Sequence, residues 1–291
     1  MSKKKVKVPI ALRVVRWWFP KLEKYAPSLA IRLFVQLFFT PLHYGFPEKE
    51  KEWIEKSHQF QFLVKGKKIM VYSWGEETKP IVLFIHGWAG RSTQFRNFFP
   101  VFMDAGFRVV SFDGPAHGKS GGKRTNLLEF QEILRDIFGK FGKPKGVIAH
   151  SFGGVAMLMG IANGLEIDKL VNIGTPSIGD KIILTFLKAV NGSWSTGEQF
   201  KKYTMRKYNR SFDEFSGEYF LKQIKNKEIK SLDLLLIHDE NDKDVTIDHA
   251  ERAIELFPQA RLHRTSGLGH TRILKDDKVI ATSLQFILPN G

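Results

Sequence analysis

The sequence feature that most constrains the fold is an alternation of short apolar stretches with amphipathic helical stretches, which begins near Ser57. Several apolar stretches are continuous, including residues 81–85 and 234–237, as is typical of parallel strands buried on both faces. Strands are predicted at residues 58–64, 68–74, 81–86, 107–113, 146–150, 168–174, 232–238 and 260–265. The alternation predicts an α/β fold with a mostly parallel, helix-covered sheet.

The helix over residues 127–141 has the clearest start signal. Its apolar residues recur at helical spacing, and Asn126 with Glu129 three residues later can cap its first turn. A second helix, over residues 155–162, is expected to end at Asn163-Gly164. Helices of this length between apolar strands are those that cover a parallel sheet.

One interval breaks the alternation. After the strand at 168–174, about 55 residues precede the next strand, which is too long for a structureless loop. Residues 180–190 and 215–224 have helical patterns, so we expect a helical cap insertion at residues 177–230. The insertion contains many aromatic residues, which form its own small core or line an apolar pocket: Trp194, Phe200, Tyr203, Tyr208, Phe212, Phe215, Tyr219 and Phe220.

Residues 1–56 precede the alternating pattern and are predicted to be a basic helical extension. Within residues 28–39, polar residues recur every fourth position and leave a wide apolar face. We expect this helix to pack on the main domain. The alternative is an interfacial membrane helix, which Trp17, Trp18 and the neighbouring lysines favour. The predicted core domain therefore comprises residues 57–176 and 231–291.

The charge distribution identifies two basic segments, and the lack of cysteine excludes all chemistry that needs a thiol. The net charge of +15 comes from residues 1–68, at +10, and residues 177–230, at +5, whereas the remainder is neutral. The basic surface either keeps the protein soluble or contacts a membrane through residues 1–40, and no nucleic-acid partner is expected. The absence of cysteine excludes disulfides, thiolate metal sites and cysteine nucleophiles. We expect a cytoplasmic protein, because we find no secretory signal in the sequence. It also has no apolar run of the roughly 18 residues that a transmembrane helix needs. Its oligomeric state cannot be read from the sequence.

The candidate nucleophile lies in residues 146–154, which read GVIAHSFGG. An apolar strand leads into Ser151, and small residues then lead into a helix, which is the layout of a nucleophile elbow. The usual G-x-S-x-G pattern has Ala149 at its first position here, the next smallest choice. At a helix N-terminus, N–H groups without an intrahelical acceptor stabilise developing negative charge, so the backbone N–H of Phe152 is a candidate oxyanion donor.

A second oxyanion donor is expected after the strand at 81–86. The strand ends in His86-Gly87-Trp88, and the loop can supply the backbone N–H of Trp88. We interpret His86 itself as a structural support of this turn.

The acid and the base follow later strands. Beyond the strand at 232–238, Asp242 is the predicted acid, with Asp244 and Asp239 as alternatives. His270 follows the last strand in a loop with Gly267 and Gly269. The chain order of serine, then acid, then histidine is the order required of a catalytic triad on this type of sheet.

Two stretches resemble ligand-binding loops but depart from the required patterns. If a calcium-binding loop began at Asp239, Lys243 would occupy its fifth position, where an oxygen ligand is needed. The sixth position, which requires glycine, has none. Residues 114–120 end in Gly-Lys-Ser, but Gly114 and Gly118 enclose three residues where a phosphate loop has four. We expect a structural turn at 114–120 and no metal site.

Taken together, these motifs resemble the α/β-hydrolase family in its serine esterase, lipase and thioesterase branch, over residues 81–291. The resemblance implies an eight-stranded sheet with a small helical cap after strand 6, and no cofactor. It is carried by His86-Gly87-Trp88, by Asp113 with residues 114–120, by residues 150–154, and by Asp242 and Gly269-His270. Branches with an aspartate nucleophile, such as epoxide hydrolases, are disfavoured because a serine occupies the elbow.

The predicted activity is that of a carboxylesterase-like serine hydrolase. Ser151 attacks an ester or thioester of a small apolar acyl or aryl substrate, His270 is the general base, and Asp242 orients the imidazole. The alternatives are a non-catalytic binding protein on the same fold, or hydrolysis of an amide, a lactone or a carbon–carbon bond, since the same triad serves them all.

Overall fold

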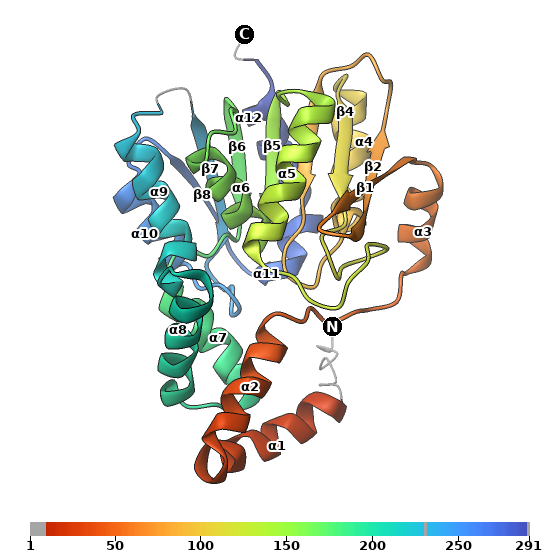
Figure 1. Cartoon of the computed structure of the whole chain (residues 1–291). Coiled ribbons are helices and arrows are strands. Elements are labelled where there is room, and N and C mark those ends of the chain that lie inside the picture. Colours follow the sequence, from red (N-terminus) through yellow and green to blue (C-terminus); the bar gives the residue numbers. More distant parts are fainter. Residues whose placement is uncertain (1–9, 230–231, 290–291) are drawn as a thin grey trace. The chain divides into compact units, whose positions relative to one another are not determined.

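The computed structural model describes residues 10–229 and 232–289 (Figure 1). Contacts between Cα atoms divide the chain into two compact units. The first unit holds the residues up to Phe39 together with Gly179–Glu214, and the second holds Thr40–Ile178 together with the residues from Phe215 onwards. Each unit is therefore built from segments that are far apart in the sequence.

The second unit is built on an eight-stranded sheet with the strand order β1-β2-β4-β3-β5-β6-β7-β8 (Figure 1). The strands are β1 His58–Val64, β2 Lys67–Trp74, β3 Ile81–Ile85, β4 Arg108–Phe112, β5 Gly146–His150, β6 Lys169–Ile173, β7 Asp233–Asp239 and β8 Arg261–Thr265. Only β2 runs antiparallel to its neighbours, β1 and β4. The predicted strands and the mostly parallel sheet are confirmed, and no strand bound differs from its prediction by more than one residue.

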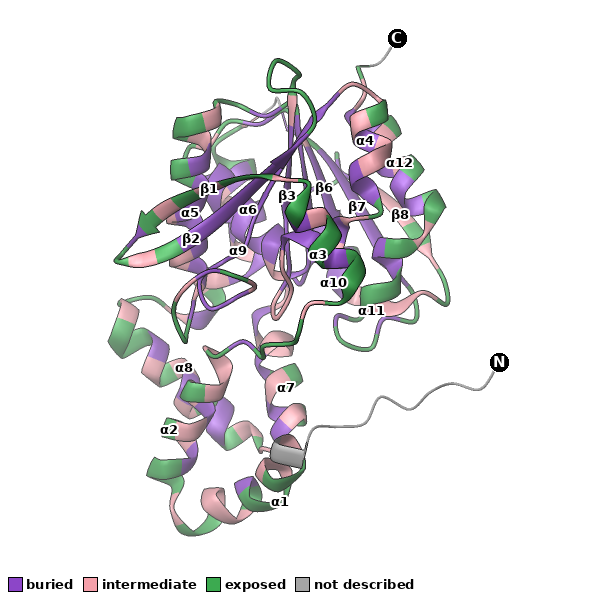
Figure 2. Ribbon diagram, turned by 90° about the vertical axis from the view of Figure 1, so that its right-hand side faces the viewer, coloured by how far each residue is buried: buried purple, intermediate pink, exposed green. Residues whose placement is uncertain are grey.

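Helices cover both faces of this sheet, as predicted. One layer consists of α5 Leu127–Phe141, α6 Phe152–Ala162, α9 Gly217–Asn226 and α10 Asp248–Leu256, and the other contains α3 Glu48–Glu55, α4 Phe98–Asp104 and α12 Asp277–Ile287. Successive strand residues point to opposite layers: Leu83 packs beneath the first, and Phe84 beneath the second. The central strands are buried along their length (Figure 2).

The local signals that predicted α5 are present in the structure. The Asn126 side chain accepts a 3.1 Å hydrogen bond from the backbone N–H of Glu129, which satisfies one donor of the first turn. The helix ends at Phe141, and Gly142 follows with a φ of 75°, a conformation that favours glycine.

The described residues of the first unit form four α-helices that pack together. Its helices are α1 Ile10–Tyr25, α2 Pro27–Phe38, α7 Gly179–Val190 and α8 Trp194–Tyr208. Phe19 and Phe34 from the N-terminal pair are buried with Ile183 and Phe200 from the inserted pair. We expected an N-terminal extension and a separate cap, and expected residues 28–39 to pack on the main domain. In the structure, the apolar faces of α1 and α2 pack against α7 and α8, so the N-terminal segment and part of the insertion form one unit.

The unit boundaries also differ from those expected at residues 56 and 230. Helix α3 belongs with the sheet because Glu50 forms ion pairs with Arg91, at 2.9 Å, and Arg96, at 3.3 Å. At the other boundary, Phe220 and Ile224 of α9 join the core of the second unit together with residues of α6. The inserted segment of the first unit therefore ends at Glu214.

Within the described ranges, no helix is both long and apolar enough to cross a bilayer.

Candidate active site

Ser151 lies on a tight turn between β5 and α6. Its φ of 51° and ψ of −120° are unusual for a residue with a side chain, so the turn is strained. The turn requires small neighbours, because a Cβ on Gly153 would collide with the carbonyl oxygens of Ile85 and His86. The structure therefore places Ser151 on the elbow that the sequence predicts.

The three side chains chosen from the sequence meet at the carboxyl ends of the strands. The Nε2 atom of His270 is 3.0 Å from the Ser151 hydroxyl oxygen, and its Nδ1 atom is 2.6 Å from Oδ2 of Asp242. Because Asp242 accepts from Nδ1–H, Nε2 is left as the acceptor for the serine hydroxyl. Ser151 is 8% exposed and Asp242 is 4% exposed. The site is thus largely shielded from water.

The Asp242 carboxylate is held in its ionised form. Burial by itself raises its pKa, but the hydrogen bond and charge of His270, together with two backbone N–H donors, outweigh that effect. The second carboxylate oxygen, Oδ1, accepts from the N–H groups of Asp244, at 2.9 Å, and Val245, at 3.0 Å. The net result is a pKa below the ordinary value of an aspartate. Asp242 can therefore orient the imidazole throughout the range in which histidines titrate.

The other two candidate acids occupy different positions. The Asp239 carboxylate binds the loop that carries His270, since it accepts from the N–H groups of Asn241, Leu268 and Gly269 and from the hydroxyl of Thr265. Burial raises the pKa of Asp239, but these hydrogen bonds lower it more. Asp244 contributes its backbone N–H to Asp242. The sequence correctly predicted acidic residues after β7, but only their contacts in the structure show which of the three is hydrogen-bonded to His270.

His150 is a site residue that the sequence analysis did not single out. Its Nε2–H donates to the backbone carbonyl of His270 at 2.9 Å, and its Nδ1 accepts from the Gln94 side chain at 3.3 Å. Burial, aided by the nearby His270, lowers the pKa of His150 to about 3. A neutral imidazole therefore connects the elbow to the backbone of the candidate base. Its position directly before the serine was the only signal in the sequence.

The loop after β3 approaches the elbow closely. A Cβ on Gly87 would lie 2.9 Å from both the Cβ of Ser151 and the Nδ1 of His150, so only glycine fits there. The Trp88 ring packs edge-on against Phe152, with ring centroids 5.4 Å apart. The loop after β3 therefore lies close to the start of α6.

His86 supports the loop, as expected. Its Nδ1–H donates to the Gly87 carbonyl at 2.8 Å, and its Nε2 accepts from the Gly114 N–H at 2.8 Å. Burial lowers the pKa of His86 to about 4. His117, which the sequence analysis did not interpret, accepts from the Ala89 N–H at 3.1 Å, and burial lowers its pKa to about 3. Both imidazoles are neutral structural groups.

The turn at residues 114–120 is organised by the buried carboxylate of Asp113. It accepts from the N–H groups of Ser92 and Lys119, each at 2.8 Å, and from the Tyr72 hydroxyl at 2.9 Å. Burial raises the pKa of Asp113. Gly118 has a φ of 48°, and a Cβ there would collide with the Asp113 carboxylate. The turn wraps a protein carboxylate, which supports a structural role over a phosphate-binding one.

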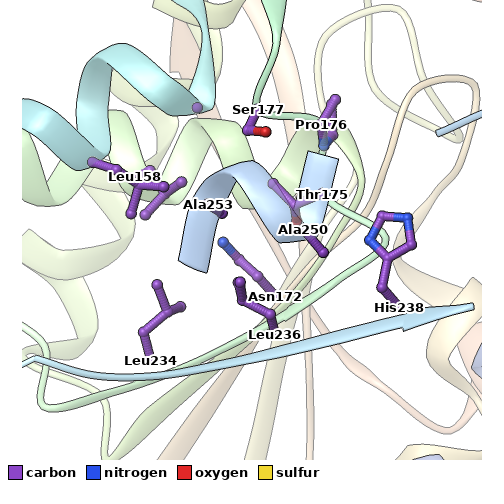
Figure 3. Close-up of a pocket in the computed structure, with 12 residues that line it drawn as sticks. Leu158, Asn172, Thr175, Pro176, Ser177, Leu234, Leu236, His238, Ala250 and Ala253 are labelled. Carbon is purple, nitrogen blue, oxygen red and sulfur yellow. The ribbon is translucent and has the colours of Figure 1, made fainter. Parts of the chain in front are cut away.

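A small cavity lies between β6, β7 and helices α6, α9 and α10 (Figure 3). Its volume of about 10 Å³ is room for one water molecule, so it is too small to be a substrate pocket. The Asn172 amide and the Thr175 hydroxyl line it, and neither has a hydrogen-bond partner within the described part of the chain. The Thr175 hydroxyl also restricts residue 154 of the elbow to glycine.

An eight-stranded sheet with this strand order, carrying serine, aspartate and histidine in that chain order at the carboxyl ends of its strands, defines the class of α/β-fold hydrolases. The model of the alpha/beta hydrolase family matches residues 82–282. The chain therefore belongs to the alpha/beta hydrolase family.

Individual relatives match shorter parts. A monoacylglycerol lipase of Mycolicibacterium smegmatis is 32% identical over 101 residues, which cover 31% of this chain and 36% of the lipase. Epoxide hydrolase 1 of Caenorhabditis elegans is 26% identical over 209 residues, which cover 63% of this chain and 50% of that protein. Among solved structures, an esterase from Exiguobacterium antarcticum has a TM-score of 0.62 at 18% identity and covers 79% of this chain and 99% of its own. The chain thus spans between a third and a half of the length of these two curated relatives.

Proposed function

We propose that this protein is a serine hydrolase that cleaves an ester or thioester with an apolar acyl or aryl group. The observation that carries the proposal is the hydrogen-bonded series Ser151–His270–Asp242, with 3.0 Å between the hydroxyl oxygen and Nε2 and 2.6 Å between Nδ1 and the carboxylate. In this geometry a serine hydroxyl can lose its proton as it attacks a carbonyl carbon.

In the first half-reaction, Ser151 Oγ forms a bond to the carbonyl carbon while its proton moves to Nε2 of His270. The carbonyl electron pair moves onto the oxygen. When the tetrahedral intermediate collapses, the bond to the leaving group breaks, and His270 returns the proton to that group. In the second half-reaction, water attacks the acyl carbon while His270 takes its proton; the bond between the acyl group and Ser151 Oγ then breaks, and His270 returns the proton to Oγ. Asp242 stabilises the imidazolium form in both steps.

The backbone N–H groups of Trp88 and Phe152 are the proposed donors to the oxyanion. Phe152 is the first residue of α6, where an N–H has no intrahelical acceptor and the helix dipole favours negative charge. The close approach of Gly87 to Ser151 supports this choice, because the loop that carries Trp88 passes beside the serine. Removing one such donor typically costs roughly 100- to 1,000-fold in rate.

The lipase and esterase among the relatives support an ester substrate, and the serine distinguishes this chain from the aspartate-nucleophile branches. The epoxide hydrolase match does not alter the proposal, because Ser151 stands at the elbow. A non-catalytic binding protein is a weaker candidate, since the serine, base and acid are all present within hydrogen-bond distance.

Labelling with a fluorophosphonate probe tests the proposal. We expect covalent modification of Ser151 in the wild-type chain, no modification in Ser151→Ala, and full modification in Ser28→Ala, whose exposed serine is a matched control. Hydrolysis of p-nitrophenyl esters of increasing chain length should fall at least about 10⁴-fold in Ser151→Ala. Absence of labelling in wild-type protein with a native circular dichroism spectrum would refute the assignment of the nucleophile.

A further inference from the structure

Helix α1 presents an exposed aromatic face. Val14, Trp17, Trp18 and Tyr25 are 51%, 60%, 50% and 75% exposed, and Leu29 at the start of α2 is 53% exposed. These five account for half of the ten large hydrophobic side chains that are highly exposed in the described residues. Tryptophans are costly to leave in water, so their concentration on one helix indicates a binding surface.

The spacing along α1 separates this face from the buried one. Residues 14, 17, 18, 21 and 25 lie on one side of the helix, while Phe19 is fully buried on the other and Val15 and Leu22 pack beside it. The exposed face also contains Lys21, whose ammonium lies 3.1 Å from the centre of the Trp17 ring. The helix is therefore amphipathic, and its outer face combines aromatic with cationic groups.

The orientation of α1 within its unit is fixed by polar contacts. The Glu23 carboxylate accepts from the N–H of Ser193, at 2.8 Å, and from the hydroxyl of Thr196, at 2.6 Å, at the N-terminus of α8. Two turns earlier in the helix, Arg16 donates to the carbonyl of Ala189 at 2.8 Å. Because the helix is held from its inner side, the tryptophans cannot turn inward without breaking these bonds.

The net charge of the first unit indicates which kind of surface the exposed face of α1 binds. Residues 1–39 and 179–214 contain 16 Lys and Arg against 5 Asp and Glu, so they hold +11 of the net charge of +15 in about a quarter of the chain. Lys3, Lys4, Lys5 and Lys7 precede α1 in the sequence. A surface this basic repels a second copy of itself but is attracted to an anionic one.

We propose that α1 and the start of α2 bind the surface of an anionic lipid bilayer, with Trp17, Trp18 and Tyr25 at the headgroup level and the lysines against the lipid phosphates. Tryptophan and tyrosine favour this interfacial position, where one end of the ring is apolar and the other is hydrated. Basic residues near an anionic membrane each strengthen binding severalfold. The contact is peripheral and does not depend on the proposed hydrolase activity.

Sedimentation with lipid vesicles tests the proposal. Ether-linked lipids exclude any effect of ester hydrolysis. The full chain should bind vesicles of phosphatidylcholine with phosphatidylglycerol at least about tenfold more tightly than vesicles of phosphatidylcholine alone, and salt at about 0.5 M should reduce binding. Headgroup-labelled or chain-labelled quencher lipids should quench tryptophan fluorescence.

Two pairs of variants separate the aromatic from the ionic contribution. Trp17→Ser with Trp18→Ser should lose at least about tenfold in vesicle affinity and most of the quenching, whereas Leu63→Ser, at a residue 78% exposed on β1, should bind as wild type. Lys21→Glu with Lys24→Glu should lose a similar factor. Lys123→Glu with Lys278→Glu changes the net charge equally from the second unit and should have a much smaller effect.

Three outcomes would overturn the proposal: equal, weak binding of the full chain to neutral and anionic vesicles; unchanged binding by the tryptophan pair; or equal losses for the two lysine pairs. Preferential binding of DNA over vesicles that depends on Lys21 and Lys24, without tryptophan quenching, would assign the surface to nucleic acid. Circular dichroism and Tm of each variant show that the fold is retained.

Discussion

Acidification from about pH 7.5 to about pH 5 should destabilise the fold, because buried histidines must take up protons when the chain unfolds. Burial lowers the pKa of His86 to about 4 and the pKa values of His117 and His150 to about 3. Each ring has one nitrogen that accepts a hydrogen bond, from Gly114, Ala89 and Gln94 respectively, and protonation would remove that acceptor.

The size of the effect follows from the difference between folded and unfolded pKa values. In the unfolded chain a histidine has a pKa near 6.5, so at about pH 5 these three hold about three more protons unfolded than folded. Each therefore removes roughly 2 kcal/mol of stability over this interval. Asp113, whose pKa burial raises, acts in the opposite sense and takes up at most one proton in the native state. The expected net loss is about 4 to 6 kcal/mol, a large part of the stability of an ordinary domain.

Urea unfolding followed by tryptophan fluorescence and circular dichroism, repeated at several pH values, measures this loss. The free energy of unfolding should fall by about 3 to 4 kcal/mol per pH unit near pH 5.5. His86→Gln should reduce the proton uptake by about one. His58→Gln, at an exposed position on β1, should leave the slope unchanged.

A free energy of unfolding that changes by less than about 1 kcal/mol over the interval would contradict the reasoning. It would mean that the native state accommodates the protonated imidazoles. An unchanged slope in a folded His86→Gln protein would likewise show that this residue is not among the groups that titrate on unfolding.

Asp242→Asn should lower kcat on a p-nitrophenyl ester about 10³- to 10⁴-fold, because the amide favours the wrong imidazole tautomer. Asp244→Asn should change kcat less than about threefold. Comparable losses in both variants would contradict the choice of Asp242 as the acid. Gly118→Ala should lower the free energy of unfolding by about 2 to 4 kcal/mol, since its φ is 48° and the methyl displaces the Asp113 carboxylate. In the same urea titration Gly139→Ala, in the open helical surface of α5, should stabilise by about 0.5 to 1 kcal/mol, and equal effects would refute the steric argument.

Much of the second unit could be predicted from the sequence because its signals are local. A continuous apolar run specifies a buried strand, and Asn126 with Glu129 specifies the start of α5, whatever the rest of the chain does. The elbow around Ser151 is local as well, since a strand, a serine and small residues suffice to define it. The packing of α1 and α2 against α7 and α8 could not be predicted, because an apolar helix face does not specify which other helix it packs against.

The sequence by itself determined the strands, their helical cover and the chain order of serine, acid and histidine, because each depends on residues that are neighbours along the chain. Only the tertiary structure decided that Asp242 binds His270 while Asp239 binds the loop, and that His150 contacts the backbone of residue 270. The exposed face of α1 was decided in the same way. The physical reason is that these contacts join positions 28 to 173 residues apart, where the pairing depends on how the whole unit packs.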